Sequence, residues 1–252
     1  MKGKHSNFLI FAALFGLSFS LFGVGTTFSA GVDIQSLQEK AGENPRYSID
    51  KNTQKLTFLC AAEGKLPLET GDLKTFTPQR VARKFFKVYG SYFGIRKSRK
   101  DLQMVEQKEE SSGMVHIRYA QQHKGVKVFG GEIMVHLNSD YSVSSANGRL
   151  VPRVKVNIHP KISKGAAEKA ARELWQSEFG TDDPQMQAIE LAILNKGILE
   201  NKKDERDYLV WKINLANRET FRHKTYFINA RNGKLVYQRV DAISSLGKKN
   251  MK

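Results

Sequence analysis

Residues 116–137 read HIRYAQQHKGVKVFGGEIMVHL, and this stretch decides the fold class. Apolar and polar residues alternate on both sides of its centre, which is typical of strands buried on one face. Because only a short turn joins these strands, they must run antiparallel. Gly130 and Gly131 interrupt the second alternation. They predict a bulge or kink between two short strands, 126–129 and 133–137.

A helix precedes these strands, and a second helix followed by strands comes after them. Thr77 can cap the first helix, whose apolar residues recur at helical spacing over 81–93. Ser163 can open the second helix, and Asn232-Gly233 marks a tight turn between two later strands. The class is therefore α+β. We expect two successive cystatin-like units, each a helix packed on an antiparallel sheet.

The chain divides into five segments on this basis. We expect a signal peptide, a leader containing one hairpin, two folded units and a polar tail, at residues 1–30, 31–75, 76–152, 160–241 and 242–252. The leader hairpin is predicted from two apolar runs, 47–49 and 56–59, on either side of the polar turn DKNTQ.

The first thirty residues have the order of an export signal. Lys2 and Lys4 give a positive start, residues 8–25 carry no charge, and small residues follow up to Ala30. The alternative is an uncleaved anchor, because the uncharged run is almost long enough to span a bilayer. We expect a secreted or periplasmic protein that is attached to a membrane only if this segment stays uncleaved.

The charge balance is strongly basic. The chain carries 41 Lys and Arg against 25 Asp and Glu, a net charge of +16, and loss of Lys2 and Lys4 with the signal leaves +14. Such a charge suits an acidic partner, an anionic surface or nucleic acid, and export argues against nucleic acid. The alternative is a basic, solvated surface without a partner. The single cysteine, Cys60, lies among apolar neighbours and is expected to be a buried structural residue.

A search for catalytic motifs finds none. None of the six histidines belongs to an H-E-x-x-H zinc motif, and no G-x-S-x-G nucleophile turn occurs. His116 and His123 are seven residues apart, which would put them on opposite faces of a regular strand. Gly130-Gly131 lacks the spacing of a phosphate-binding loop. We therefore expect no catalytic residue, no metal site and no cofactor.

The stretch 116–137 resembles the fungalysin/thermolysin propeptide domain, whose strands read like H-x-R-[YF]-x-Q, G-V-x-V-[FY]-G and E-[IL]-x-V-H. The segment ANGRLVP at 146–152 is similar to the usual end of that unit. The residues that match the three strand patterns are His116, Arg118, Tyr119, Gln121, Gly125, Val126, Val128, Phe129, Gly130, Glu132, Val135 and His136.

The second unit resembles a PepSY domain. The similar segments are ISKGAAEKAA at 162–171, YLVWKINL at 208–215 and YFINARNGKLVYQ at 226–238. Asn229 stands where that family more commonly has Asp, a mild departure. The two domains in this order resemble the propeptide of thermolysin-like metallopeptidases, and the resemblance covers about 56–243.

This resemblance implies a non-catalytic protein that binds a secreted thermolysin-like zinc metallopeptidase as an inhibitor or folding chaperone. In such precursors the peptidase follows a V-D-x-I region, here Val240, Asp241 and Ile243, whereas this chain stops at Lys252. We expect it to act in trans or to come from a split gene, with those three residues reaching the peptidase. The alternatives are an envelope-associated PepSY-type binding or structural protein and a truncated remnant of a metallopeptidase precursor.

Overall fold

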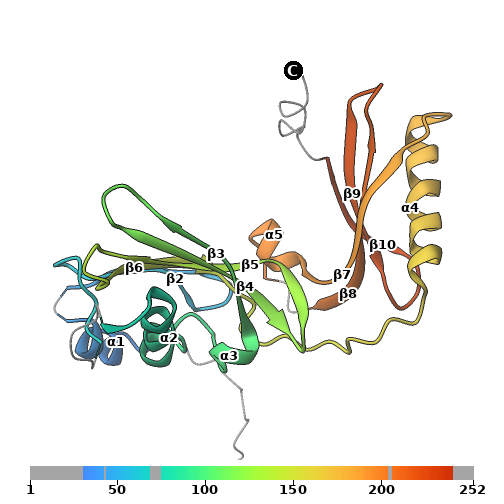
Figure 1. The fold of residues 1–252 in the computed structure, drawn as a ribbon. Helices are drawn as coiled ribbons and strands as arrows, with labels where there is room; N and C mark the ends of the chain where they lie inside the picture. The colour runs from blue at the N-terminus through green and yellow to red at the C-terminus, as the bar shows by residue number, and fades with distance from the viewer. Residues whose placement is uncertain (1–30, 43, 69–74, 204–205, 241–252) are drawn as a thin grey trace, which may run out of the picture.

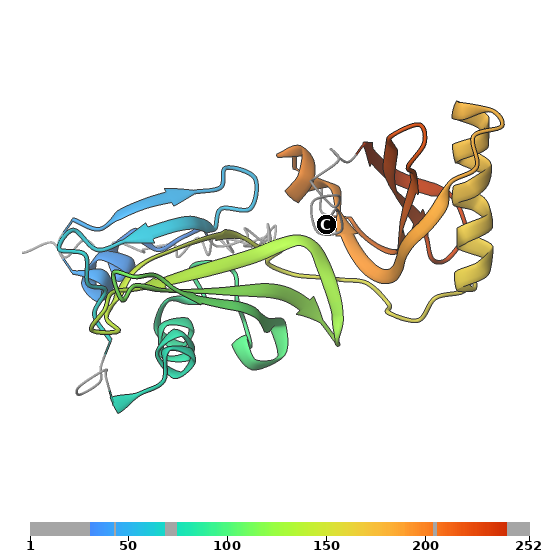
Figure 2. The same cartoon turned by 45° about the horizontal axis from the view of Figure 1, so that its top comes forward.

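The molecule consists of two sheet-and-helix parts set at an angle (Figure 1). The computed structural model describes residues 31–42, 44–68, 75–203 and 206–240. Helices α1, α2 and α3 lie on the outer side of the first sheet, and α4 lies on the outer side of the second (Figures 1 and 2). The fold is α+β, with few helices and one large, curved sheet. The predicted signal, 1–30, and tail, 242–252, lie outside the described residues.

The N-terminal part holds three helices and six strands. In chain order they are α1 (Ile34–Ala41), β1 (Arg46–Ile49), β2 (Leu56–Cys60), α2 (Pro78–Tyr89), α3 (Ser98–Asp101), β3 (Leu102–Glu109), β4 (Val115–His123), β5 (Val126–Leu137) and β6 (Val143–Arg149). The strands pair antiparallel in the order β1-β2-β6-β5-β4-β3. The predicted leader hairpin is β1–β2, and because β2 also pairs with β6, that hairpin extends the first sheet.

Helix α2 supplies the helical side of the N-terminal core. The Thr77 hydroxyl accepts the Arg80 N–H at 3.3 Å, and Pro78 occupies the first turn, where no N–H is needed. The helix ends at Tyr89, earlier than predicted, and residues 90–94 continue as turns. Its buried face packs on the sheet through Val81, Ala82, Phe85, Phe86 and Tyr89. Helix α1, which was not predicted, adds the fully buried Leu37 to this core.

The C-terminal part packs one long helix on four antiparallel strands. Its elements are α4 (Lys164–Phe179), β7 (Gln185–Asn195), α5 (Lys196–Glu200), β8 (Asp207–Asn217), β9 (Arg222–Asn229) and β10 (Leu235–Val240). The Ser163 hydroxyl accepts the Ala166 N–H at 3.1 Å and so begins α4, as predicted. Ala167 and Ala171 let α4 approach the sheet closely, and Trp175 fills the remaining space. No helix among the described residues has the length and apolar content needed to cross a membrane.

Strand β5 joins the two parts, and here the predicted bulge at Gly130-Gly131 is confirmed, whereas the prediction of two separate short strands is wrong. Residues 126–129 and 133–137 were expected to be two short strands, but β5 runs unbroken from Val126 to Leu137 with an irregularity in its pairing to β4. Gly130, at φ +78°, makes the bend, a conformation that costs glycine little. On the N-terminal side of this bend, Val128 pairs parallel with Ile193 of β7. The ten strands of the described residues therefore belong to one continuous sheet, whose halves β1–β6 and β7–β10 are called the first sheet and the second sheet.

Three buried tyrosines predict a loss of stability in alkali. Burial raises the pKa of Tyr89, Tyr119 and Tyr226 to about 12 from the ordinary 10.0. The Tyr89 hydroxyl donates to the carbonyl oxygens of Lys40 at 2.8 Å and Pro67 at 2.9 Å. The folded state holds the hydroxyl protons of these tyrosines to higher pH than the unfolded chain does. Their contribution to the free energy of unfolding is therefore complete below pH 10.0 and is lost as the pH rises to about 12.

Urea denaturation between about pH 8 and about pH 12 measures this effect as a falling free energy of unfolding. Replacing Tyr89 with Phe should reduce the fall, whereas replacing the exposed Tyr47 with Phe should leave it unchanged. A free energy of unfolding that stays constant across this range would contradict the prediction.

Candidate partner-binding surface

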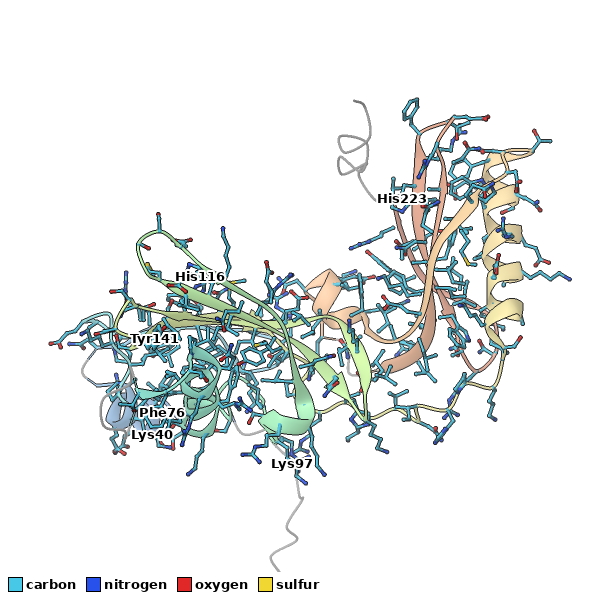
Figure 3. All side chains as sticks on the ribbon, in the orientation of Figure 1. Lys40, Phe76, Lys97, His116, Tyr141 and His223 are labelled. Carbon is cyan, nitrogen blue, oxygen red and sulfur yellow. The ribbon has the colours of Figure 1, made fainter. Side chains whose placement is uncertain are left out.

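The face of the first sheet that points away from α1 and α2 is polar. The strand register sets His116 beside His136, and it sets Met134 between Arg118 and Asn147 of the neighbouring strands. The residues that alternate with them along β4 and β5 are buried in the core beneath. Figure 3 shows His116 on the opposite side of the sheet from Lys40 and Phe76. Among the described residues, α5 at the junction is the helix drawn on this side of the first sheet, and α1, α2 and α3 lie on the other side (Figures 1 and 2).

A row of hydrogen bonds crosses this face through the two histidines. His136 Nε2 lies 2.6 Å from Asn147 Oδ1, an acceptor, so Nε2 carries the hydrogen. His116 Nδ1 lies 2.6 Å from His136 Nδ1, and His116 Nε2 lies 3.1 Å from Glu110 Oε1. The row links the β3–β4 turn to β6 and stiffens the face.

Arg118 is the second polar centre of the face. Its guanidinium lies 2.6 Å from a Glu106 carboxylate oxygen and 3.5 Å from one of Glu132. All three side chains are at least 39% exposed, so these ion pairs contribute little to stability. The buried Arg118 Nε has no hydrogen-bond partner among the described residues. Arg118 can therefore exchange its partners for a carboxylate of another protein.

The face of the second sheet that lies opposite α4 is more aromatic. The Phe129 ring packs on Phe227, with ring centroids 4.8 Å apart, and Phe227 contacts Tyr237 at 5.8 Å. Lys212 Nζ and the Arg239 guanidinium lie 5.3 and 5.1 Å from the centre of the Phe129 ring. Phe129 belongs to β5, so this cluster forms where the two parts meet. Aromatic rings flanked by cations are common in protein contact surfaces.

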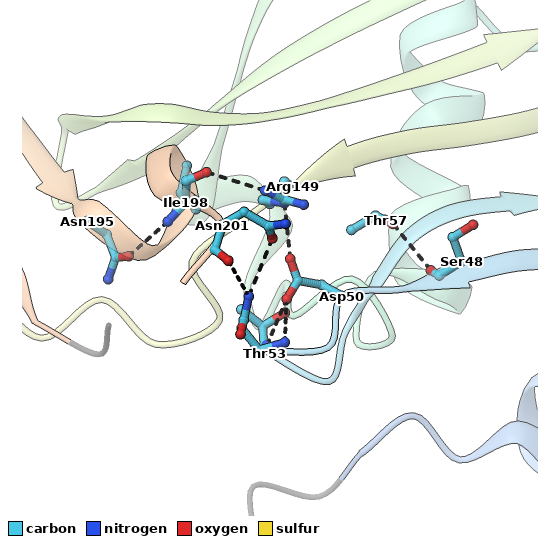
Figure 4. A network of polar contacts seen from close by, with 9 residues as sticks. Ser48, Asp50, Thr53, Thr57, Arg149, Asn195, Ile198 and Asn201 are labelled. Atoms are coloured by element: carbon cyan, nitrogen blue, oxygen red, sulfur yellow. Dashed lines mark hydrogen bonds and ion pairs between the residues drawn. The ribbon is translucent and has the colours of Figure 1, made fainter. Parts of the chain in front are cut away.

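Polar contacts fix the two parts against each other at their junction, as Figure 4 shows. The Asp50 carboxylate lies 3.1 Å from Arg149 Nε, and Arg149 Nη1 donates to the Ile198 carbonyl oxygen at 3.4 Å. Asn52 Nδ2 donates to the Asn201 carbonyl oxygen at 3.2 Å. These contacts join the β1–β2 turn and β6 to α5. The faces of the two sheets that lie opposite α2 and α4 border one inner angle, and α5 lies where they meet (Figures 1 and 2).

Of the three residues predicted to reach a partner, the structure describes Val240. Val240 is 75% exposed and ends the outermost strand of the C-terminal part. Asp241 and Ile243 lie outside the described residues. Cys60 is 8% exposed and buried, as predicted. In the part of the chain that the structure describes, no group of three or more His, Cys, Asp or Glu side chains is placed to hold a metal ion.

The pairing of His116 with His136 was missed by the sequence-based reasoning, which compared His116 only with His123. A regular hairpin about residues 124–125 would set His116 opposite Ile133. Four residues of β5, 128–131, instead lie opposite the single residue Gln121, and the register shifts by three. The Gly130-Gly131 pair was the available signal, but it gives the place of a bulge and not its size.

Comparison with known proteins agrees with part of the expected resemblance. Residues 100–150 match the Fungalysin/Thermolysin Propeptide Motif. This match spans β3 to β6 and therefore includes both histidines and Arg118. Among solved structures, the chain is similar to the Bacillus megaterium YpeB C-terminal domain, with 15% sequence identity and a TM-score of 0.37. That similarity covers 82% of this chain and 95% of the other.

Proposed function

We propose that this chain is a non-catalytic, propeptide-like protein that binds a secreted thermolysin-like zinc metallopeptidase as an inhibitor or folding chaperone. One observation carries the proposal, the match of residues 100–150 to a propeptide motif. A propeptide acts by binding its peptidase, so the chain needs no reacting groups, metal or cofactor of its own. In this proposal the two parts are a propeptide-motif unit and a PepSY-like unit, both cystatin-like, and the protein works after export, in a secreted or periplasmic location.

The inner angle is the surface that would hold the peptidase. Its first side offers the row His116–His136 and the exchangeable ion pairs of Arg118. Its second side offers the Phe129 cluster. Because the junction contacts set the two faces at an angle, a rounded partner would meet both at once. The chain beyond Val240, including Asp241 and Ile243, would lead toward the peptidase cleft.

The test is inhibition of a purified thermolysin-like zinc peptidase from the source organism by the full chain, measured as the inhibition constant for peptide hydrolysis. Met134→Arg places an unpaired charge in the centre of the polar face, where Met134 is half-buried. We expect it to weaken inhibition at least about tenfold, because a charge enclosed in an interface without a partner is costly. Deleting residues 241–252 should also weaken inhibition.

The matched control is Gln176→Arg, which adds the same charge on the exposed outer side of α4 and should leave inhibition unchanged. Slow refolding of the denatured peptidase with and without the chain separates a chaperone from an inhibitor. Chelator-sensitive cleavage of peptides by the purified chain itself would overturn the proposal, as would unchanged inhibition by both Met134→Arg and the tail deletion.

A further inference from the structure

The outer side of the N-terminal part carries a dense positive surface. Residues 75–101, which include α2 and α3, contain eight Lys and Arg and a single acidic residue, Asp101. The linker that follows β6 adds two more cations on the same side. The basic face is defined here as Arg80, Arg83, Lys84, Lys87, Arg96, Lys97, Arg99, Lys100, Arg153 and Lys155.

These cations have no partners that would neutralise them. Nine of the ten are exposed and Lys84 is half-buried. Between residues 31 and 240, leaving out 43, 69–74 and 204–205, no carboxylate forms an ion pair with any of the ten. The Asp101 carboxylate accepts the backbone N–H groups of Arg96 at 3.3 Å and Lys97 at 2.7 Å. The Asp207 carboxylate likewise accepts the Lys155 backbone N–H at 2.6 Å, so ten cations and two neighbouring carboxylates leave an excess of eight positive charges among these described residues.

The fold gathers these residues on one side. Helix α2 buries its apolar side against the sheet, so its basic side must point outward. Helices α2 and α3 lie on the outer side of the first sheet, and Lys97 points away from the molecule (Figures 1 and 3). A groove of about 490 Å³ connects the loop before α3 with the linker, and its lining residues include the cations Arg96, Lys97, Arg153 and Lys155.

An aromatic ring lies at the edge of the basic face. Phe76 is half-buried, and its ring centre lies 4.5 Å from the Arg80 guanidinium and 4.6 Å from Lys84 Nζ. An aromatic ring between flexible cations suits the boundary between water and lipid headgroups, where apolar and charged groups are both accommodated.

The uncharged N-terminal run precedes α1 by a short stretch of chain, and α1 is packed beside α2 of the basic face. Only residues 26–33 separate the run 8–25 from α1. The Ser36 and Tyr92 hydroxyls lie 2.9 Å apart, and the Tyr89 hydroxyl donates to the Lys40 carbonyl oxygen, so α1 is held against the end of α2. Insertion of the run in a bilayer would therefore hold the basic face near the lipid surface.

We propose that the basic face docks on a bilayer surface rich in anionic phospholipid headgroups. The charge is spread over two helices and a linker, which suits an extended surface better than one acidic side chain or a short acidic peptide. Each Lys or Arg near such a surface adds to the attraction, and salt screens it. This docking goes beyond peptidase binding and leaves the inner angle, on the opposite side of the first sheet, free (Figure 1).

The experiment measures co-sedimentation of the full chain with vesicles of phosphatidylcholine, with and without phosphatidylglycerol. We expect binding at least about tenfold tighter to the anionic vesicles at about 0.1 M salt, and most of that difference to vanish at about 1 M salt. Four cations of the basic face are exchanged together for neutral residues in the test variant, Arg83→Gln, Lys87→Gln, Lys97→Gln and Lys100→Gln. This variant should lose the preference for anionic vesicles.

A matched control removes the same charge from exposed positions in the C-terminal part. It carries Lys203→Gln, Arg218→Gln, Arg231→Gln and Lys234→Gln. The proposal requires that the control keeps the preference and that circular dichroism of both variants matches the parent. The proposal would be overturned by equal binding to both kinds of vesicle or by an equal loss of the anionic preference in both variants. Binding of polyglutamate without binding of anionic vesicles would also overturn it. Peptidase inhibition should be unchanged in the test variant, so this result is independent of the proposed function.

Discussion

Replacing Trp175 with alanine is expected to lower the free energy of unfolding of the C-terminal part by about 3–5 kcal/mol. Trp175 is fully buried and is the largest side chain on the inner face of α4. The other fully buried residues of α4 are Ala167 and Ala171, whose side chains cannot extend into the space it would leave. The Phe179 ring, 4.8 Å away between centroids, would lose its stacking partner as well. The cavity would therefore stay largely open.

Urea denaturation followed by circular dichroism measures this loss. Trp211 then remains as the chain's one tryptophan and reports on β8 by fluorescence. The conservative change Trp175→Phe should cost much less, and Gln176→Ala, at the exposed neighbouring position, almost nothing. The N-terminal core contains no residue beyond Leu150, so its own transition should persist. A loss below about 1 kcal/mol for Trp175→Ala would refute this account of the core.

Gly148→Ala is expected to destabilise the N-terminal part by about 3 kcal/mol or more. Gly148 lies on β6 opposite Ile133 of β5. An added Cβ would overlap the Glu132 carbonyl oxygen and lie 2.5 Å from Ile133 Cα. Both obstacles are backbone atoms, so no side chain can turn aside to make room. The β5–β6 pairing would have to open, which would also displace the polar face that Met134 and His136 occupy.

The matched control is Gly165→Ala on α4, where an added Cβ meets nothing within 4 Å. It should leave stability unchanged or slightly raised, because alanine favours a helix more than glycine does. Thermal unfolding compares the two variants directly. If Gly148→Ala unfolds at the same temperature as the parent, the close approach of β5 and β6 is not required for the fold.

Local patterns were sufficient for most of the elements. Thr77 followed by Pro78 begins α2, and Ser163 begins α4, because a hydroxyl that accepts an N–H is a short-range device readable from the chain. The two main helices, the leader hairpin and the α+β class followed from such signals. Helices α1, α3 and α5 were missed because each is short, and α1 and α5 owe their place to tertiary contacts, such as the burial of Leu37 and Ile198.

The candidate surface depended on information that no local pattern contains. His116 and His136 face each other only because residues 128–131 leave the β4 ladder and Val128 pairs with β7. Where residues 128–131 leave β4, the Gln121 side-chain amide bonds to the backbone of Val151. It donates to the Val151 carbonyl oxygen at 2.7 Å and accepts the Val151 N–H at 2.9 Å. Gly131 leaves room for this amide, since an added Cβ would lie 2.7 Å from Gln121 Oε1.

The sequence by itself determined the α+β class, the two helix-then-strands segments, the basic composition and the resemblance of residues 116–137 to a propeptide unit. Tertiary structure alone decided that β5 is shared by both parts and that the sheet faces opposite α2 and α4 border one inner angle. The reason is physical. Periodicity reports which side of an element is buried, whereas the register across a large bulge and the pairing of distant strands depend on contacts between residues far apart in the chain.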